Sequence, residues 1–267
     1  MMKKILAIAL AIVMLFAVVA CNKNGADDGN DDAVADKVIQ NDTYTDANTG
    51  DVLSYAVNDR GSYEITGFVS NDHTPHKVEI PAQINGVEVT GIADHAFKVN
   101  NQIKEIVLPD SILYIGDWAF FGCGALASIT LPNSVEELGV GAFDDCTALT
   151  SVKLSDKLSK ITEFAFRGCT ALESVELPLS VKEIGDGAFF RCEALTEIVI
   201  PGAVEVIGDG AFMKCTNLAQ ANVSFSVKTI GVRAFDGAAE GFAIAAAPGS
   251  VAATYAADNG YGFVSVS

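Results

Sequence analysis

The most reactive residue type in this chain is cysteine, and five of its six cysteines recur at a fixed interval. These are Cys123, Cys146, Cys169, Cys192 and Cys215, each 23 residues from the next. Thiols in such a series can act as nucleophiles, form disulfides, bind a metal ion or pack in a core. The elements that carry them decide between these roles.

Disulfides and metal binding both fit the spacing poorly. Five cysteines cannot pair completely, although an exported protein meets oxidising conditions. Stacked coils would hold equivalent side chains parallel at about 4.8 Å, whereas a disulfide needs Cβ atoms about 3.5–4.5 Å apart that point toward each other. Metal sites need closely spaced ligands, and His73-x-x-His76 is a weak pair in a polar loop. We therefore favour a column of buried, inert thiols and predict no metal site and no cofactor.

The sixth cysteine, Cys21, stands in a different context. Residues 1–20 contain a short positive n-region, an apolar run and the small residues Val18-Val19-Ala20, a pattern typical of a signal peptide. A cysteine directly after such a site resembles the bacterial lipoprotein box. By that resemblance Cys21 is lipidated and anchors an exported chain to a bacterial membrane, at the cell surface or in the periplasm. Ordinary secretion, with Cys21 incidental, is the alternative.

The segment 21–51 is polar and acidic, and we predict a disordered tether there. Its aspartates lack the alternating spacing and the closing glutamate of a calcium loop. The net charge of the whole chain is −17. That charge argues against nucleic-acid binding, which needs clustered lysine and arginine.

The cysteines belong to a repeat of 23 residues that needs no gap between 108 and 222. Its most constant feature is an Ala-Phe pair, whose phenylalanines are Phe97, Phe120, Phe143, Phe166, Phe189, Phe212 and Phe235. A fixed period of this length predicts a solenoid in which each unit buries its apolar face on its neighbours.

Within a unit, the segment 126–131 (LASITL) has the leucine-rich repeat strand pattern. Alternation directs Ile129 and Leu131 inward and Ser128 and Thr130 to solvent. Gly139 is predicted to permit the turn that leads to the next Ala-Phe pair.

The consensus LPxSVxxIGxxAFxxCxxLxxI resembles the BspA-like leucine-rich repeat family of bacteria, also found in treponemal surface proteins. The resemblance covers about 80–235. It implies a mainly β repeat solenoid with 23-residue coils, short helical turns, a β-rich N-terminal cap over 52–79 and a β-α-β C-terminal cap over 236–267. Members of the family adhere to host matrix proteins or to other bacteria, so a protein partner is expected; we predict a monomer.

No nucleophile elbow, phosphate-binding loop or His-Glu-x-x-His motif occurs, so we predict no enzyme. Carboxylate pairs such as Glu136-Glu137 and Asp144-Asp145 occupy positions that vary between units, which indicates solvated surface.

The expected binding surface is the outward face of the strands. Its candidate residues are Glu105, Ser128, Thr130, Ser151, Lys153, Ser174, Glu176, Glu197, Gln220 and Asn222. An ordinary solvated sheet is the alternative for any one of them. Trp118 replaces a residue that is often glycine. We expect it to cover the solenoid flank, and anchoring of a partner is the alternative. An envelope scaffold that recruits a bacterial partner is a second functional hypothesis. Carbohydrate binding is a third, which would use exposed aromatic rings such as Trp118 and Tyr114.

Overall fold

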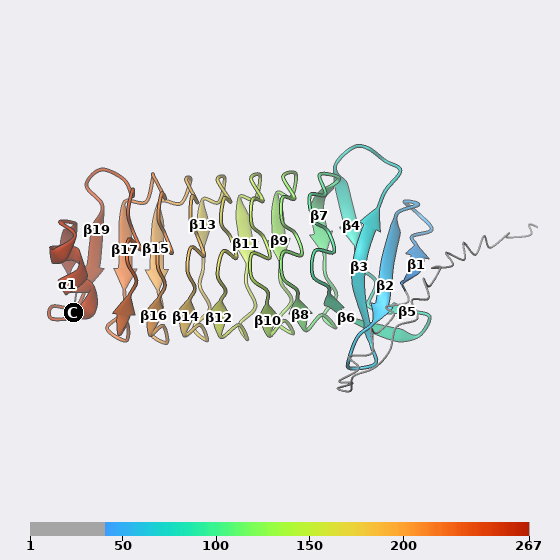
Figure 1. The fold of residues 1–267 in the computed structure, drawn as a ribbon, viewed down its shortest axis with the longest axis horizontal. Helices are drawn as coiled ribbons and strands as arrows, with labels where there is room; N and C mark the ends of the chain where they lie inside the picture. Colours follow the sequence, from blue (N-terminus) through green and yellow to red (C-terminus); the bar gives the residue numbers. More distant parts are fainter. Residues whose placement is uncertain (1–40, 267) are drawn as a thin grey trace, which may run out of the picture. The chain divides into compact units, whose positions relative to one another are not determined.

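Residues 41–266 of the computed structural model are described, and they form a stack of coils that progresses along one axis (Figure 1). The predicted signal peptide, Cys21 and the first part of the predicted tether lie outside the described residues. Among the described residues, no helix is long and apolar enough to cross a membrane.

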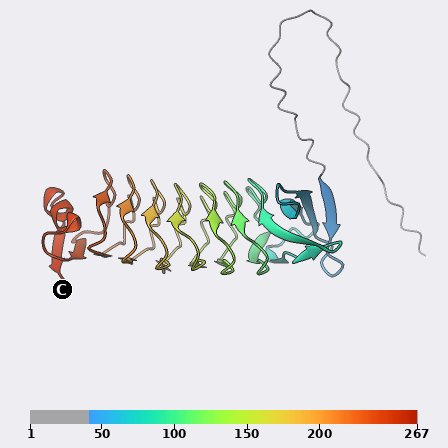
Figure 2. The same cartoon turned by 90° about the horizontal axis from the view of Figure 1, so that it is seen from below.

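Each repeat coil contributes one strand to each of two faces of the stack, as the view from below also shows (Figure 2). Neighbouring strands are parallel and paired in the register of the repeat, so that Ser151 lies opposite Ser128 on one side and Ser174 on the other. The predicted leucine-rich repeat solenoid with coils of 23 residues is confirmed.

We call the outward surface of the longer strands the strand face. Its strands are β4 (His76–Glu79), β7 (Ile103–Val107), β9 (Ser128–Thr130), β11 (Ser151–Lys153), β13 (Ser174–Val175), β15 (Glu197–Ile200), β17 (Gln220–Val223), β19 (Ala243–Ala246) and β20 (Gly262–Ser265). The opposite face is made of two-residue strands, the first two of which continue the sheet of the N-terminal cap while the other four form a separate sheet. These are β8 (Tyr114–Ile115), β10 (Glu137–Leu138), β12 (Lys160–Ile161), β14 (Glu183–Ile184), β16 (Val206–Ile207) and β18 (Thr229–Ile230).

The core is a continuous column of stacked phenylalanine rings. All seven repeat phenylalanines are at most 1% exposed. Neighbouring rings have centroids 4.9–5.4 Å apart and interplanar angles of 3–10°. Phe68 of the N-terminal cap and Phe242 of the C-terminal cap continue the column, with centroids 6.1 and 5.2 Å from Phe97 and Phe235. The caps therefore cover the two open ends of the core.

The Ala-Phe segment of each coil forms successive hydrogen-bonded turns, such as Phe121 N to Trp118 O at 3.0 Å and Cys123 N to Phe120 O at 3.1 Å. These turns stand where short helical turns were predicted. The one helix in the described range is α1 (Val251–Asp258), in the C-terminal cap.

Gly139 is required for a reason other than the predicted one. Its φ is not positive, but a Cβ there would lie 2.3 Å from the carbonyl carbon of Gly116 in the preceding coil. Close approach of two coils, and not the conformation of a turn, excludes a side chain at this position. Positive φ occurs two residues later, at Gly141 (φ 60°).

The N-terminal cap begins earlier than predicted. Strand β1 (Asp42–Thr45) pairs antiparallel with β2 (Val52–Val57), so the predicted disordered tether over 21–51 is wrong for this segment. Backbone pairing and the partly buried Tyr44 offset the low hydrophobicity that suggested disorder. β2 and β3 (Tyr63–Val69) form an antiparallel hairpin. β5 (Gln83–Ile84) then turns through Asn85-Gly86, both with positive φ, into β6 (Val87–Ile92).

The C-terminal cap has the expected β-α-β order. Ser250 caps α1 by accepting a hydrogen bond from Ala253 N at 3.2 Å. The helix packs on β19, and the chain returns in β20, parallel to β19. Phe242 and Tyr261 meet edge to face behind this helix, with ring centroids 5.2 Å apart.

Candidate functional site

The ten candidate residues named from the sequence lie in two straight rows on the strand face. The structure places Glu105, Ser128, Ser151, Ser174, Glu197 and Gln220 in one row, and Thr130, Lys153, Glu176 and Asn222 in the other. Parallel in-register pairing sets equivalent residues side by side within each of the two sheets of this face, one from β4 to β13 and one from β15 to β20, and the repeat continues the rows across the junction. Val107 and Val199 complete the second row with apolar side chains.

Two shallow hollows of the same construction lie where the strands run into the following turn. The first is lined by residues within 105–132 and the second by residues within 151–179, two repeat periods further on. Seven candidate residues line these hollows: Glu105, Ser128, Thr130, Ser151, Lys153, Ser174 and Glu176. The strand face is therefore shallowly hollowed at two equivalent places, two repeat periods apart.

The middle and the C-terminal part of the strand face differ in their hydrogen bonding. Asn222 Nδ2 donates to Glu197 Oε1 at 2.6 Å, and Gln220 Nε2 donates to Asn222 Oδ1 at 2.6 Å. These side chains are held by one another. The hydroxyls of Ser128, Ser151 and Ser174 make no such bond within the described chain, so they are free to contact a ligand.

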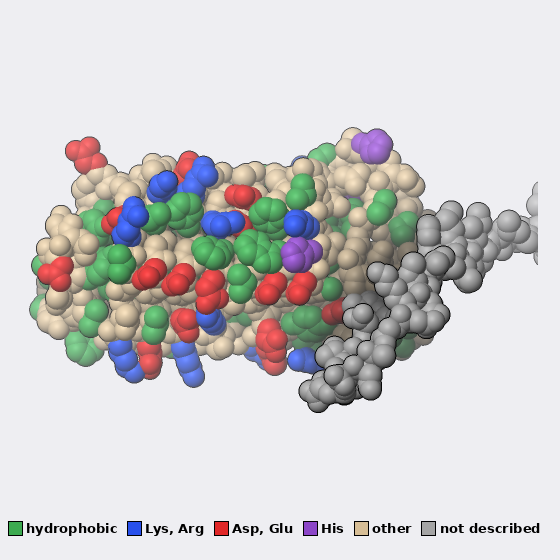
Figure 3. All heavy atoms as spheres, in the orientation of Figure 1, with side chains coloured by type: hydrophobic (Ala, Val, Ile, Leu, Met, Phe, Trp, Pro, Cys, Tyr) green, Lys and Arg blue, Asp and Glu red, His purple; other side chains and the backbone are tan. Residues whose placement is uncertain are grey.

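The turns carrying the Ala-Phe pairs form a third surface, which we call the turn face. Figure 3 shows basic and hydrophobic side chains side by side along one face of the stack, next to a row of acidic ones. Aspartates in these turns bind the next coil: Asp94 Oδ1 accepts from Asp117 N, and Asp117 Oδ1 accepts from Val140 N, both at 2.7 Å. This ladder has a structural role, because it satisfies backbone groups between coils.

Trp118 lies half-buried on the turn face and covers the neighbouring coil. A Cβ at Gly141 would lie 2.4 Å from its indole ring, so glycine alone fits beneath it. The indole meets Phe121 edge to face at 5.8 Å, and the guanidinium of Arg167 lies 5.8 Å from its centroid. Arg167 is also 5.0 Å from the ring of Phe164. The expected flank-covering role of Trp118 is thus observed.

The expectation that Asp144 is a solvated surface residue is wrong. Its side chain is fully buried and forms a two-pronged ion pair with Arg167, with Nε donating to Oδ1 at 2.8 Å. Burial raises the pKa of Asp144, and the arginine opposes that rise. Other coils have different side chains at the position of Asp144. This coil can bury a carboxylate there because the next coil supplies Arg167 as its ion-pair partner.

The aromatic pair considered for carbohydrate binding does not form a platform. Tyr114 OH donates to Glu64 Oε2 at 2.5 Å and accepts from Asn58 Nδ2 at 3.3 Å, which ties it to the N-terminal cap. Burial and this carboxylate raise its pKa well above the ordinary value. Trp118 packs instead on Phe121 and Arg167. Aligning the repeat units with one another would have identified Phe121, Phe164 and Phe190 as the other aromatic residues of the turn face.

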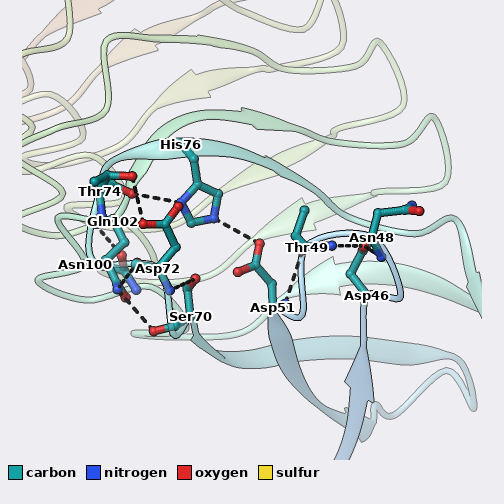
Figure 4. A network of polar contacts seen from close by, with 10 residues as sticks. All are labelled: Asp46, Asn48, Thr49, Asp51, Ser70, Asp72, Thr74, His76, Asn100 and Gln102. Carbon is teal, nitrogen blue, oxygen red and sulfur yellow. Dashed lines mark hydrogen bonds and ion pairs between the residues drawn. The ribbon is translucent and has the colours of Figure 1, made fainter.

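His76 belongs to a polar network in the N-terminal cap and not to a metal site with His73 (Figure 4). Its Nε2 lies 3.0 Å from Asp51 Oδ2 and its Nδ1 lies 2.9 Å from the Thr74 carbonyl. Both neighbours are acceptors, so the ring makes both hydrogen bonds only as an imidazolium. Among the described residues, no cluster of histidine, cysteine, aspartate and glutamate could hold a metal ion.

The pKa values within this network follow from the same contacts. The Thr74 carbonyl raises the pKa of His76, burial opposes it, and Asp51 adds to the rise. Burial would raise the pKa of Asp51, but the Ser70 hydroxyl, His76 and Thr49 together hold it below its ordinary value. Asp51 Oδ1 is buried and makes no hydrogen bond of normal geometry, although the Ser70 hydroxyl faces it.

Comparison with protein families gives a match to the BspA type leucine rich repeat region, in six copies over residues 76–163 and 141–240. Together these ranges span more than half of the chain. No curated protein matches the chain.

Several solved bacterial structures are similar to this chain. A leucine-rich repeat protein of Treponema pallidum has 24% identity, covers 84% of this chain and 99% of its own, and has a TM-score of 0.49. A leucine-rich repeat protein of Bacteroides ovatus has 22% identity, with 73% and 69% covered and a TM-score of 0.31. The pneumococcal vaccine antigen PcpA has 14% identity, with 85% and 99% covered and a TM-score of 0.36.

Proposed function

This chain belongs to the BspA-type leucine-rich repeat family of bacteria, and on that premise we propose that it is a lipid-anchored envelope protein that binds another protein through its strand face. Leucine-rich repeat solenoids are in general scaffolds for protein interaction. The observation that carries the proposal is the strand face itself, where free serine hydroxyls lie in a row between Glu105 and Glu197.

Small side chains suit such a role because they let a partner approach the sheet closely. Ser128, Ser151 and Ser174 present hydroxyls that both donate and accept hydrogen bonds. The hollows beside these serines give a partner a concave surface to fit. Lys153 and Glu176 place one positive and one negative charge in the second hollow. We assign the face a binding role and no catalytic one.

The membrane link in this proposal is Cys21. The signal-like segment 1–20 ends in small residues directly before it. One acyl-modified cysteine carrying more than one chain gives stable anchoring. The polar segment that follows would hold the solenoid away from the bilayer. Within this scheme we favour adhesion to a host or bacterial surface protein, with recruitment of an envelope partner as the competing role.

The two roles are separated by what the protein binds. The chain with Cys21→Ser, which keeps the solenoid and removes the lipid, would be immobilised and exposed to purified host extracellular-matrix proteins and, separately, to solubilised bacterial envelope. Saturable binding of a matrix protein supports adhesion. Binding of envelope components alone would refute the adhesin role and favour scaffolding. Absence of any protein ligand would refute the proposed function as a whole. Labelling with a radioactive fatty acid tests the anchor, since label should enter the native chain and not the Cys21→Ser variant.

A further inference from the structure

Three large apolar side chains are exposed near the C-terminal margin of the strand face. Leu179 is 82% exposed, Phe225 is 70% exposed and Val199 is 57% exposed. Exposing these groups to water is unfavourable, and clustered exposure of this kind marks interaction sites. Together with Gly202 we call these residues the apolar notch.

The repeat brings these residues together. Leu179, Gly202 and Phe225 hold the same position in three successive coils, in the turn that follows the strand. At about 4.8 Å per coil, Leu179 and Phe225 stand roughly 10 Å apart. The space above Gly202 is open, because the nearest heavy atom to a Cβ there would be Ser224 Oγ at 3.9 Å. Val199 lies on β15, three residues before Gly202, and faces outward beside this gap.

The notch is particular to this end of the stack. The same turn position in the earlier coils holds Asp110, Asn133 and Asp156. In that part the turns are joined by polar contacts, such as Asn133 Nδ2 donating to Asp156 Oδ2 at 3.2 Å. The fold therefore does not require apolar residues at this position, since the same turn forms with polar ones.

The rim of the notch is acidic. Glu176 and Glu197 are exposed beside Val199: Glu176 holds the position of Val199 in the preceding coil, and Glu197 lies two residues before Val199 on β15. Glu176 makes no ion pair within the described chain, and Glu197 only accepts one hydrogen bond from Asn222. Lys153 precedes Glu176 in the second row and lines the same hollow as Leu179, where Asp156 and Glu176 outnumber it. The local field therefore favours cations.

We propose that the apolar notch docks a basic polypeptide segment of the protein partner, with one apolar side chain over Gly202 and lysine or arginine beside Glu176 and Glu197. This inference rests on the proposed function and names the chemistry of the partner. Apolar contact in the centre and charge at the rim match the usual arrangement of protein interfaces. The acidic rim disfavours the anionic surface of a bilayer as the occupant.

The test uses synthetic peptides and the chain with Cys21→Ser. One fluorescent peptide carries Leu-Val-Phe flanked by lysines; a second replaces the lysines with glutamates, and a third replaces the apolar residues with serines. We expect the first peptide alone to bind, more weakly as salt is raised, because charge contributes to the contact. Equal binding of the glutamate or serine peptide, or no binding of the lysine peptide, would overturn the proposal.

Amino-acid substitutions then test whether the lysine peptide binds at the apolar notch. Leu179→Ser with Phe225→Ser is expected to weaken binding of the lysine peptide by about tenfold or more, as loss of interface anchors does. The matched control is Val232→Ser, which is also 70% exposed but lies on the turn face, and it should leave binding unchanged. Unchanged binding of the lysine peptide in the double variant would contradict docking at the notch. The proposed function would still stand, provided that a protein ligand binds the strand face.

Discussion

The Sγ atom of Cys169 lies 3.2 Å from the carbonyl oxygen of Phe143, the core phenylalanine of the preceding coil. The same contact recurs along the column at 3.0–3.2 Å, with Cys123, Cys146, Cys192 and Cys215 each donating to the corresponding phenylalanine. Each thiol thus satisfies a backbone acceptor in its neighbour while filling a small apolar space. The column that appeared reactive in isolation is part of how the coils are joined.

The first prediction concerns these thiols. Burial raises the pKa of Cys123 and Cys215 to about 12 and that of the other three well above the ordinary value, so the reactive thiolate is scarce at neutral pH. In the chain with Cys21→Ser, we expect five thiols that a colorimetric thiol reagent titrates only after denaturation. Rapid labelling of the native chain, or fewer than five thiols after denaturation without reductant, would contradict the buried column.

The second prediction concerns the phenylalanine column. Phe166 stacks between Phe143 and Phe189, with centroids 5.4 Å away on both sides, and is fully buried. Phe166→Ala should lower the free energy of unfolding by about 3–5 kcal/mol, since it leaves a cavity. Because each coil contacts only its neighbours, a second transition should appear in denaturant unfolding followed by circular dichroism. Phe225→Ala, on the surface, is the control and should change stability by less than about 0.5 kcal/mol.

The third prediction concerns the buried charge of Asp144. Arg167→Ala leaves this carboxylate buried and unpaired, which should cost about 3–5 kcal/mol of stability at neutral pH. Adding Asp144→Ala to the same chain removes the uncompensated charge and should restore part of that loss. A double-mutant cycle in urea measures the coupling. If the two single changes were additive, the ion pair would have no energetic role.

The fourth prediction concerns pH and the N-terminal cap. The pKa of His76 is raised above 6.5 in the folded chain, so its stabilisation is complete below that pH and is lost as pH rises through the raised value. The pKa of Asp51 is lowered below 3.8, so its contribution is present above that pH and is lost on further acidification. Protection from hydrogen exchange in β1–β4, corrected for the intrinsic pH dependence of amide exchange, should therefore be greatest between these limits. His76→Gln should remove the loss of protection on the alkaline side, and an unchanged protection profile would contradict the assigned role.

Much of the fold follows from spacing alone, because a period of 23 residues fixes which side chains share a column. The burial of Phe166 and Cys169 and the outward direction of Ser151 are consequences of that period. Asp144 could not be placed in this way, since its burial depends on one arginine in the next coil and not on the repeat. Strand β1 was missed because its pairing with β2 provides the stability that its polar sequence lacks.

Surface features depend on residues that depart from the repeat, and the period of the repeat does not predict how such residues lie. Leu179 and Phe225 occupy turn positions that are polar in earlier coils, and only their exposure in the folded chain shows that nothing covers them. The need for glycine at 139 was visible in the sequence, but its cause lies in the backbone of the adjacent coil. Such contacts between coils are not encoded by one repeat unit alone.

The measurement that tests the central claim most directly compares two bulky substitutions in the same coil. Ser151→Tyr places a ring on the strand face, and Ser159→Tyr places the same ring beside β12 on the opposite sheet; both serines are exposed. Each variant, with Cys21→Ser, would be tested by surface biosensor against the protein ligand identified with the matrix or envelope panel. We predict that Ser151→Tyr weakens binding by about tenfold or more and that Ser159→Tyr leaves it unchanged. Equal effects of the two, or loss only with Ser159→Tyr, would contradict binding through the strand face.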